Sequence, residues 1–299
     1  MFMNTLTPSR IMEVGMAFWP AKVLLSAIEL GLFTTLGNGS MTGVALEKVL
    51  HLNSRANPDF FDTLVALRFL ERDGDGPEGR YRNTEETALF LDRQSPAFIG
   101  GFLEMANARL YPFWGELTAA LQTGKPQNET KHGGAGVFEE LYSKPERLEQ
   151  FMDAMAGISV GNFQALADKF DFSKYETLAD IGGAAATLSM MVANKHPHLR
   201  IVSADLPQAT AIAEKKIEAV GLSDRVSAVS IDFFKDALPK ADVITMGMIL
   251  HDWNLENKKM LIRKAYDALP EGGVFIVIEA LIDDARRENA FGLMMSLNM

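Results

Sequence analysis

The sequence predicts an α/β protein, with a parallel sheet covered by helices on both faces and a mostly helical region before it. From Thr177 onward, apolar strands alternate with amphipathic helices, a pattern typical of a parallel sheet. Before that point, apolar residues recur at helical spacing. The chain has 299 residues, 47% apolar and 23% charged, values typical of a globular protein of about two domains.

The first hundred residues have the outline of a winged helix-turn-helix. Apolar spacing predicts three helices, over about 11–33, 43–50 and 58–71. Gly31 marks the end of the first helix, and Asn57 and Pro58 are suited to the N-cap and first turn of the third. The glycine-rich segment "ERDGDGPEGRYRNT" that follows predicts a small hairpin.

Helical patterns continue to the start of the sheet. One covers about 97–122, and a long helix covers about 145–170, in which Phe151 and Met155 share a face. The five predicted strands are "TLADI", "RIVSAD", "RVSAVSID", "ADVITMGMIL" and "VFIVIEALI". Ligands of such sheets bind at the carboxyl ends of the strands, where the strand order reverses.

Composition excludes several classes of function. The chain has no cysteine, which excludes disulfides, thiolate metal sites and cysteine nucleophiles, and makes the cytoplasm the default compartment. The net charge is −10, and residues 1–100 hold nine Lys and Arg against twelve Asp and Glu, which argues against binding of nucleic acid or anionic membranes. We expect no membrane helix, because no stretch reaches the roughly 20 apolar residues required. The 16 methionines suit a pocket for a flat organic ligand, or only fill gaps in the core.

The first two strands end in residues suited to a nucleoside. The first leads into "DIGGAAA", where Gly182 and Gly183 allow a ligand close to the backbone at a helix N-terminus. A tight turn without a ligand explains these glycines equally well. Asp205 ends the second strand, 25 positions after Asp180. A carboxylate there is the expected acceptor for ribose hydroxyls, and the alternative is an N-cap of the next helix.

The third strand is followed by an aspartate and two aromatic residues. Asp232 can accept a hydrogen bond from an exocyclic adenine amine, and Phe233 can stack on the ring. The alternative is a loop aspartate and core phenylalanines.

A histidine and a glutamate follow the fourth and fifth strands, which we expect to be neighbours. His251 is the side chain type most easily poised as a base near neutral pH. Glu279, at the same edge, can orient the imidazole and stabilise its charged form, or is a surface or substrate-contacting glutamate. We expect Asp252 to cap the following helix and Trp253 to pack in the core.

In their order along the chain, these motifs resemble the S-adenosylmethionine-dependent O-methyltransferases of the plant caffeate and bacterial small-molecule type. The resemblance covers nearly all of the chain and includes "AIELGLF", "FMDAM", "LADIGG", "SADLP", "SIDFF", "LHDWN" and "ALPEGGVFIVIE". It implies a winged-helix dimerisation domain over 1–100 and a helical linker with substrate-pocket residues over 101–170. A Rossmann-like class I methyltransferase domain is implied over 171–299, without the family's C-terminal hairpin.

The resemblance also implies roles for individual residues. The cofactor S-adenosylmethionine would be held by Gly182 and Gly183 at its methionine end, Asp205 and Leu206 at its ribose, and Asp232 and Phe233 at its adenine. His251 would be the general base, flanked by Glu279 at the family's spacing of 28 residues. Phe151 and Met155 would line the acceptor pocket.

The implied activity is methyl transfer to a hydroxyl of a small, aromatic or secondary-metabolite acceptor, by a cytoplasmic homodimer that needs no metal. Two alternatives stay open: a relative that binds the cofactor without methyl transfer, and a winged-helix regulator that binds DNA. The acidic first hundred residues argue against the regulator.

Two features depart from the family pattern. Ala184 and Ala186 stand where the family has its third and fourth glycines; one Cβ is tolerable if φ stays negative, and two would weaken or tilt the cofactor. The sequence ends at Met299, shortly after the fifth strand, so no second acidic residue near the base can be assigned. Either the chain is a truncated version of a longer protein, or another surface covers the apolar edge of that strand.

Overall fold

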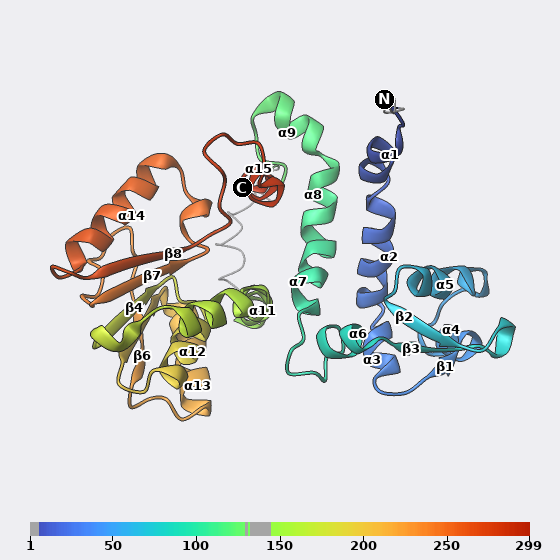
Figure 1. Ribbon diagram of the computed structural model, residues 1–299, viewed down its shortest axis with the longest axis horizontal. Helices are drawn as coiled ribbons and strands as arrows, with labels where there is room; N and C mark the ends of the chain where they lie inside the picture. Colours follow the sequence, from blue (N-terminus) through green and yellow to red (C-terminus); the bar gives the residue numbers. More distant parts are fainter. Residues whose placement is uncertain (1–5, 129–130, 132–144) are drawn as a thin grey trace, which may run out of the picture. The chain divides into compact units, whose positions relative to one another are not determined.

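The computed structural model describes residues 6–128, 131 and 145–299, and it forms two compact units, 1–140 and 141–299. Figure 1 shows their elements in the order of the sequence. Each unit has its own buried apolar core, so each is described separately. Residues 129–130 and 132–144 of the predicted helical linker lie outside the described part of the chain.

The first unit is mostly helical. Its helices are α1 (Ser9–Gly15), α2 (Phe18–Glu29), α3 (Leu32–Leu36), α4 (Gly43–Val49), η1 (Ser54–Ala56), α5 (Asp59–Ala66), η2 (Gly76–Glu78), α6 (Glu85–Phe90), α7 (Gly100–Met105), η3 (Ala106–Leu110), α8 (Tyr111–Gly115) and α9 (Leu117–Thr123). The expectation of one unbroken helix up to Gly31 is wrong, because the chain turns between α1 and α2. The predicted end at Gly31, whose φ is +70°, is confirmed. The α4 prediction is confirmed.

The third predicted helix is shorter than expected. It ends at Ala66, because Arg68 adopts a φ of +64° and β2 starts at Leu70. Asn57 does not cap it: the N-cap is Pro58, and the Asn57 amide donates to Glu47 instead. The apolar face of α5 points into the core, where Phe61 and Leu64 are fully buried.

The predicted hairpin forms and gains a third strand. β2 (Leu70–Asp73) pairs antiparallel with β3 (Arg80–Asn83), and β3 pairs with β1 (Met41–Thr42) on its other side. Tyr81 points into the core of the unit, and its hydroxyl donates to Asp62 at 2.7 Å.

The start of the chain carries an exposed apolar stretch. By length and composition alone, Ser9–Glu29 could cross a membrane, which corrects the expectation that no stretch could. A helix of a soluble protein passes the same test, so this finding is weak support for a membrane span. Ile11, Val14, Phe18 and Trp19 are each more than half exposed in the single chain.

The second unit is built on a parallel sheet, as predicted. Its strands are β4 (Thr177–Ile181), β5 (Arg200–Asp205), β6 (Val226–Ser230), β7 (Val243–Gly247) and β8 (Val274–Ile278). They lie in the order β6-β5-β4-β7-β8, and every pairing is parallel. The strand order therefore reverses between β4 and β7, and the expected pairing of the fourth and fifth strands is confirmed.

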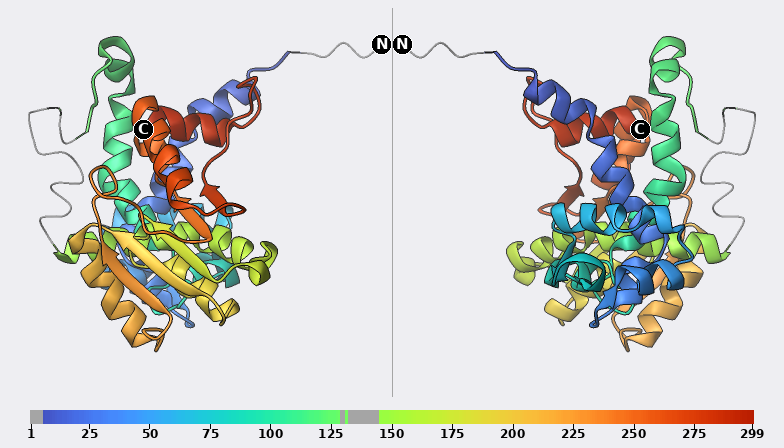
Figure 2. Two further views of the ribbon diagram at one scale, coloured as in Figure 1. Left: turned by 90° about the vertical axis from the view of Figure 1, so that its left-hand side faces the viewer. Right: turned by 90° about the vertical axis from the view of Figure 1, so that its right-hand side faces the viewer.

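Helices cover both faces of this sheet (Figures 1 and 2). The helices of this unit are α11 (Pro145–Lys169), η5 (Phe172–Lys174), α12 (Thr187–Lys195), α13 (Pro207–Ala219), η6 (Leu250–Asp252), α14 (Leu255–Ala268) and α15 (Ala290–Asn298). Figure 1 shows α14 on one face and α12 and α13 on the other. Because β4 and β7 are covered on both sides, nearly all of their residues are buried, which explains their continuous apolar sequences. The sequence analysis did not anticipate α15.

Candidate active site

The turn after β4 brings two glycines close to other parts of the unit. Gly182 has a φ of +72°, and a Cβ there would lie 2.2 Å from Cδ1 of Ile249. A Cβ on Gly183 would lie 2.2 Å from Oγ of Ser203 and 3.0 Å from Oδ2 of Asp180. Packing within the chain therefore requires glycine at both positions, whether or not a ligand approaches.

The two alanines of the same turn also adopt left-handed backbone conformations. Ala184 has a φ of +48° and Ala186 a φ of +59°. The condition that φ stays negative is therefore not met. Each left-handed alanine costs about 1–2 kcal/mol relative to a right-handed conformation. The surrounding packing offsets this strain, since Ala186 is fully buried in the core and Ala184 packs beside Ala185, Ala209 and Ile212.

Asp205, at the end of β5, is hydrogen-bonded to this turn. Its Oδ2 accepts from the backbone N–H of Ala184 at 2.9 Å, and its Oδ1 accepts from the N–H of Leu206 at 2.7 Å. The N-cap position of α13 belongs to Leu206, so Asp205 is not the N-cap that was the alternative. A carboxylate has about four acceptor positions, so hydroxyl donors can still be accepted.

The loop after β6 forms a compact turn around Asp232. Oδ1 of Asp232 accepts from the N–H of Phe234 at 3.0 Å, and Oδ2 pairs with Nζ of Lys235 at 2.8 Å. The hydrogen bond from Lys235 and that from the Phe234 backbone hold the pKa of Asp232 below its ordinary value. Phe233 lies edge-on to Phe234 and to Trp253, so Trp253 packs as predicted. The Trp253 Nε1 is buried without a hydrogen-bond partner among the described residues.

His251 and Glu279 meet at the carboxyl edge of β7 and β8. Nδ1 of His251 lies 2.5 Å from Oε2 of Glu279, and the N–H of His251 donates to Oε1 at 3.2 Å. Both side chains are mostly buried, with 18% and 12% of their areas exposed. The glutamate therefore fixes the direction of the imidazole ring.

Asp252 lies against the other ring nitrogen of His251, a contact that the sequence analysis missed. Its Oδ1 is 3.3 Å from Nε2, while the helix it was expected to cap is capped by the side chain of Asn254. Burial disfavours the imidazolium, but the hydrogen bonds and charges of Asp252 and Glu279 outweigh it and raise the pKa of His251 to about 9. The sign of this contact in the sequence is a carboxylate directly after the histidine, but a helix-capping role also explains that carboxylate.

The two residues predicted for the acceptor pocket lie on α11. Phe151 and Met155 are half-buried. Between them, Met152 packs with Leu148 against Ala185 and the α13 residues Ala209 and Ile212. The helix that carries the pair thus lies beside the turn after β4.

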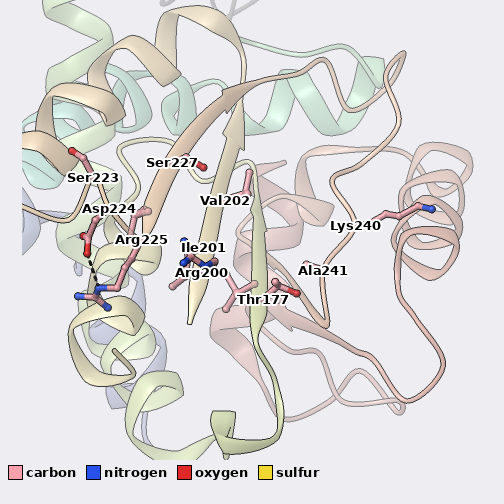
Figure 3. A pocket seen from close by; sticks show the side chains of 12 residues that line it. Thr177, Arg200, Ile201, Val202, Ser223, Asp224, Arg225, Ser227, Lys240 and Ala241 are labelled. Carbon is pink, nitrogen blue, oxygen red and sulfur yellow. Dashed lines mark ion pairs between the residues drawn. The ribbon is translucent and has the colours of Figure 1, made fainter. Parts of the chain in front are cut away.

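A cavity of about 310 Å³ lies at the opposite, amino edge of the sheet, where β4, β5 and β6 begin. Its basic side chains are Arg200, Arg225 and Lys240. Figure 3 shows Arg225 paired with Asp224, and Lys240 pointing away from that pair. Among the residues that the structure describes, no group of three or more His, Asp and Glu side chains is placed to hold a metal.

Comparison with known families identifies the chain. A sequence model described as the O-methyltransferase domain matches residues 114–299, and one described as the O-methyltransferase dimerisation domain matches residues 12–93. This chain belongs to the O-methyltransferase family. Its methyl donor is S-adenosylmethionine, the cofactor seen with related structures.

Individual relatives align with this methyltransferase over almost its full length. It is 37% identical to the tetracenomycin polyketide synthesis 8-O-methyl transferase TcmO of Streptomyces glaucescens, over 98% of this chain and 84% of that protein. It is 35% identical to the N,N-dimethyltransferase OxyT of Streptomyces rimosus, over 92% and 79% of the two chains. The structure of human N-acetylserotonin methyltransferase in complex with S-adenosylmethionine superposes with a TM-score of 0.89, at 27% identity, over 100% of this methyltransferase and 87% of that chain.

The strain at Ala184 predicts a stabilising substitution. Ala184→Gly should raise the free energy of unfolding by about 1 kcal/mol, because glycine adopts a positive φ without a steric penalty. Denaturant unfolding of the full chain measures this. Ala185→Gly is the control, since Ala185 is buried without a positive φ and its substitution should destabilise. Equal destabilisation by both substitutions would contradict the strain argument.

Proposed function

We propose that this enzyme transfers the methyl group of S-adenosylmethionine to a hydroxyl of a small aromatic or polyketide-like acceptor, with His251 as the general base and Glu279 as the residue that orients it. The contact of 2.5 Å between Nδ1 of His251 and Oε2 of Glu279 carries this proposal. It lies at the edge of the sheet where ligands of parallel α/β folds bind.

The residues of this edge fit the cofactor. Gly182 and Gly183 would lie at its methionine end, because both follow β4 at the carboxyl edge of the sheet and neither carries a side chain of its own. The ribose hydroxyls would donate to Asp205 beside Leu206, since the carboxylate keeps acceptor capacity. The adenine would lie between Asp232 and Phe233. Asp232 would accept a hydrogen bond from the adenine amine, and the ring of Phe233 would stack on the adenine face.

When bound, the cofactor supplies an activated methyl group on a sulfonium. The protein must align the acceptor oxygen with that methyl group and remove the hydroxyl proton. Alignment can contribute about 7–11 kcal/mol, and a positioned base about 10²–10⁴-fold. With Nδ1 held by Glu279, the proton would be taken by Nε2 of His251, after Asp252 has moved away from that atom.

An aromatic or polyketide-like acceptor is supported by the similarity to TcmO, whose name gives a polyketide pathway. Phe151 and Met155 of α11 would form an apolar wall for such a planar molecule. An amine acceptor is the second candidate, favoured by 35% identity to OxyT, which is named as an N,N-dimethyltransferase. Similarity to methyltransferases along the whole chain favours either of these over a DNA-binding regulator or a relative without methyl transfer.

We further propose a cytoplasmic homodimer formed through the first unit, without nucleic acid or membrane as a partner. The match to the dimerisation domain supports it. So do the exposed apolar residues Ile11, Val14, Phe18 and Trp19, which a second copy would cover.

The general-base role predicts the behaviour of His251→Ala. Turnover of a phenolic acceptor should fall about 10²–10⁴-fold, because the base is lost. The affinity for S-adenosylhomocysteine, measured by calorimetry, should stay within about twofold, since His251 lies outside the residues proposed to hold the cofactor. His51→Asn is the control, because His51 is exposed on the first unit and has a φ of +54°, which asparagine adopts readily. Undiminished turnover in His251→Ala would refute the role.

The carboxylates beside His251 predict the pH profile. A base acts in its neutral form, so kcat/KM of the unaltered enzyme should rise with pH toward about 9. Asp252→Asn removes one negative charge, lowers the pKa of His251 and should move the rising limb to lower pH. Using one acceptor for both enzymes cancels the acceptor's own titration. Coincident profiles would show that Asp252 does not act on the titrating base.

The exposed apolar stretch predicts how the dimer can be weakened. Trp19, with 61% of its surface exposed, should be covered in the homodimer. Trp19→Glu would bury a charge there and should shift the protein toward monomer in sedimentation at micromolar concentration. Val220→Glu, at the C-cap of α13 in the second unit and with 57% of its surface exposed, is the control. A monomeric unaltered protein, or an unchanged dimer in Trp19→Glu, would contradict the assignment.

A further inference from the structure

One lysine of α14 is bound to the loop that follows β6. Nζ of Lys264 donates to the carbonyl oxygen of Phe233 at 2.7 Å and to that of Asp236 at 2.8 Å. The side chain is half-buried. In the described part of the chain no carboxylate lies within 4.0 Å of this ammonium group, so its hydrogen bonds go to the backbone of the loop.

The loop has a second attachment, made by aromatic rings. The Phe234 ring lies 4.6 Å from that of Trp253, and the Phe233 ring lies 6.1 Å from it, both edge-on. Trp253 follows two positions after His251. The ring contacts hold the side chains against this segment, and the Lys264 ammonium fixes the backbone that carries them.

The position of the Phe233 backbone determines where the proposed adenine pocket places the Phe233 ring. Its neighbour Asp232 accepts from within the loop, through the N–H groups of Phe234, Lys235 and Asp236. These bonds shape the turn but do not tie it to the rest of the unit. Lys264 supplies that tie, and hydrogen bonds from a charged donor are the stronger kind.

We propose that Lys264 is a positioning residue for the cofactor, which holds the Asp232–Asp236 loop where Asp232 and Phe233 receive the adenine. This rests on the proposed function, which assigns the adenine to that loop. Because Lys264 acts through the loop, its loss should weaken binding of the adenosine part and leave the transfer step at saturating cofactor unchanged.

The test compares Lys264→Met with Lys264→Arg and the unaltered enzyme. Calorimetry should show that Lys264→Met binds S-adenosylhomocysteine about tenfold more weakly, because both charge-assisted hydrogen bonds to the loop are lost. Adenosine alone should lose the same factor. kcat at saturating cofactor and KM for the acceptor should stay within about twofold. Lys264→Arg keeps charged donors and should recover most of the affinity.

Lys259→Met is the matched control, because Lys259 lies on the same helix, is exposed and, among the described residues, forms an ion pair with Glu256 alone, at 3.8 Å. It should bind like the unaltered enzyme. Equal affinity of Lys264→Met and the unaltered enzyme would overturn this inference alone. So would a loss of affinity for S-adenosylhomocysteine but not for adenosine, or a parallel loss of acceptor binding. Absence of binding by the unaltered enzyme would overturn the proposed function, and this inference with it.

Discussion

The buried carboxylate of Asp180 is the constraint on which the carboxyl edge of the sheet depends. One oxygen accepts from Thr245 of β7 at 2.8 Å, and the other accepts from Ser189 of α12 at 3.2 Å. Burial raises the pKa of Asp180 to about 6, the two hydroxyl hydrogen bonds oppose this rise, and the negative charge of Asp205 adds to it. One side chain thus joins two strands and a helix directly beneath the turn. Together with Ser203, whose Oγ is the nearer atom, it fills the space that a side chain at position 183 would need. The position of the residues proposed to contact the cofactor therefore depends on the contacts of Asp180.

Backbone strain is concentrated around the same edge. Ala184 and Ala186 adopt positive φ values after β4, and Met248, after β7, has a φ of +58°. Such conformations persist where the surrounding structure over-determines them, and they are common at functional sites. Here the surroundings are the core contacts of the alanines and the hydrogen bond from the Met248 N–H to Ile278 of β8. These strained residues lie in the segments that follow β4 and β7, and the same segments carry the residues proposed to bind the cofactor and to act as the general base.

The charges around His251 bear on two requirements of the proposed general base. Two carboxylates raise its pKa to about 9, close to the pKa near 10 of a phenol, the proposed acceptor. The same charges keep the imidazole mostly protonated at pH 7. A displacement of Asp252 by the acceptor would relieve this second effect at the moment when the base is needed.

The sequence by itself determined the class of the fold and the residues at its functional edge. Local patterns suffice for this: buried parallel strands are continuously apolar, and the chain must leave each strand through polar or glycine residues, here Gly182, Asp205, Asp232, His251 and Glu279. Boundaries in the first unit were harder: the end at Gly31 followed from the sequence, but the break between α1 and α2 and the early end of α5 before Arg68 did not, because apolar spacing continues through both points.

Only the tertiary structure decided which partners these side chains have. Asp252 lies next to His251 in sequence, but whether it caps α14 or faces the imidazole depends on how η6 turns, and Asn254 takes the cap. The contact of Lys264 with the loop after β6 joins residues about thirty positions apart, and helical periodicity gave no sign of it. Likewise, the alanines of the "DIGGAAA" turn show their strain only through φ, which is set by how the turn closes onto Asp205 and the core.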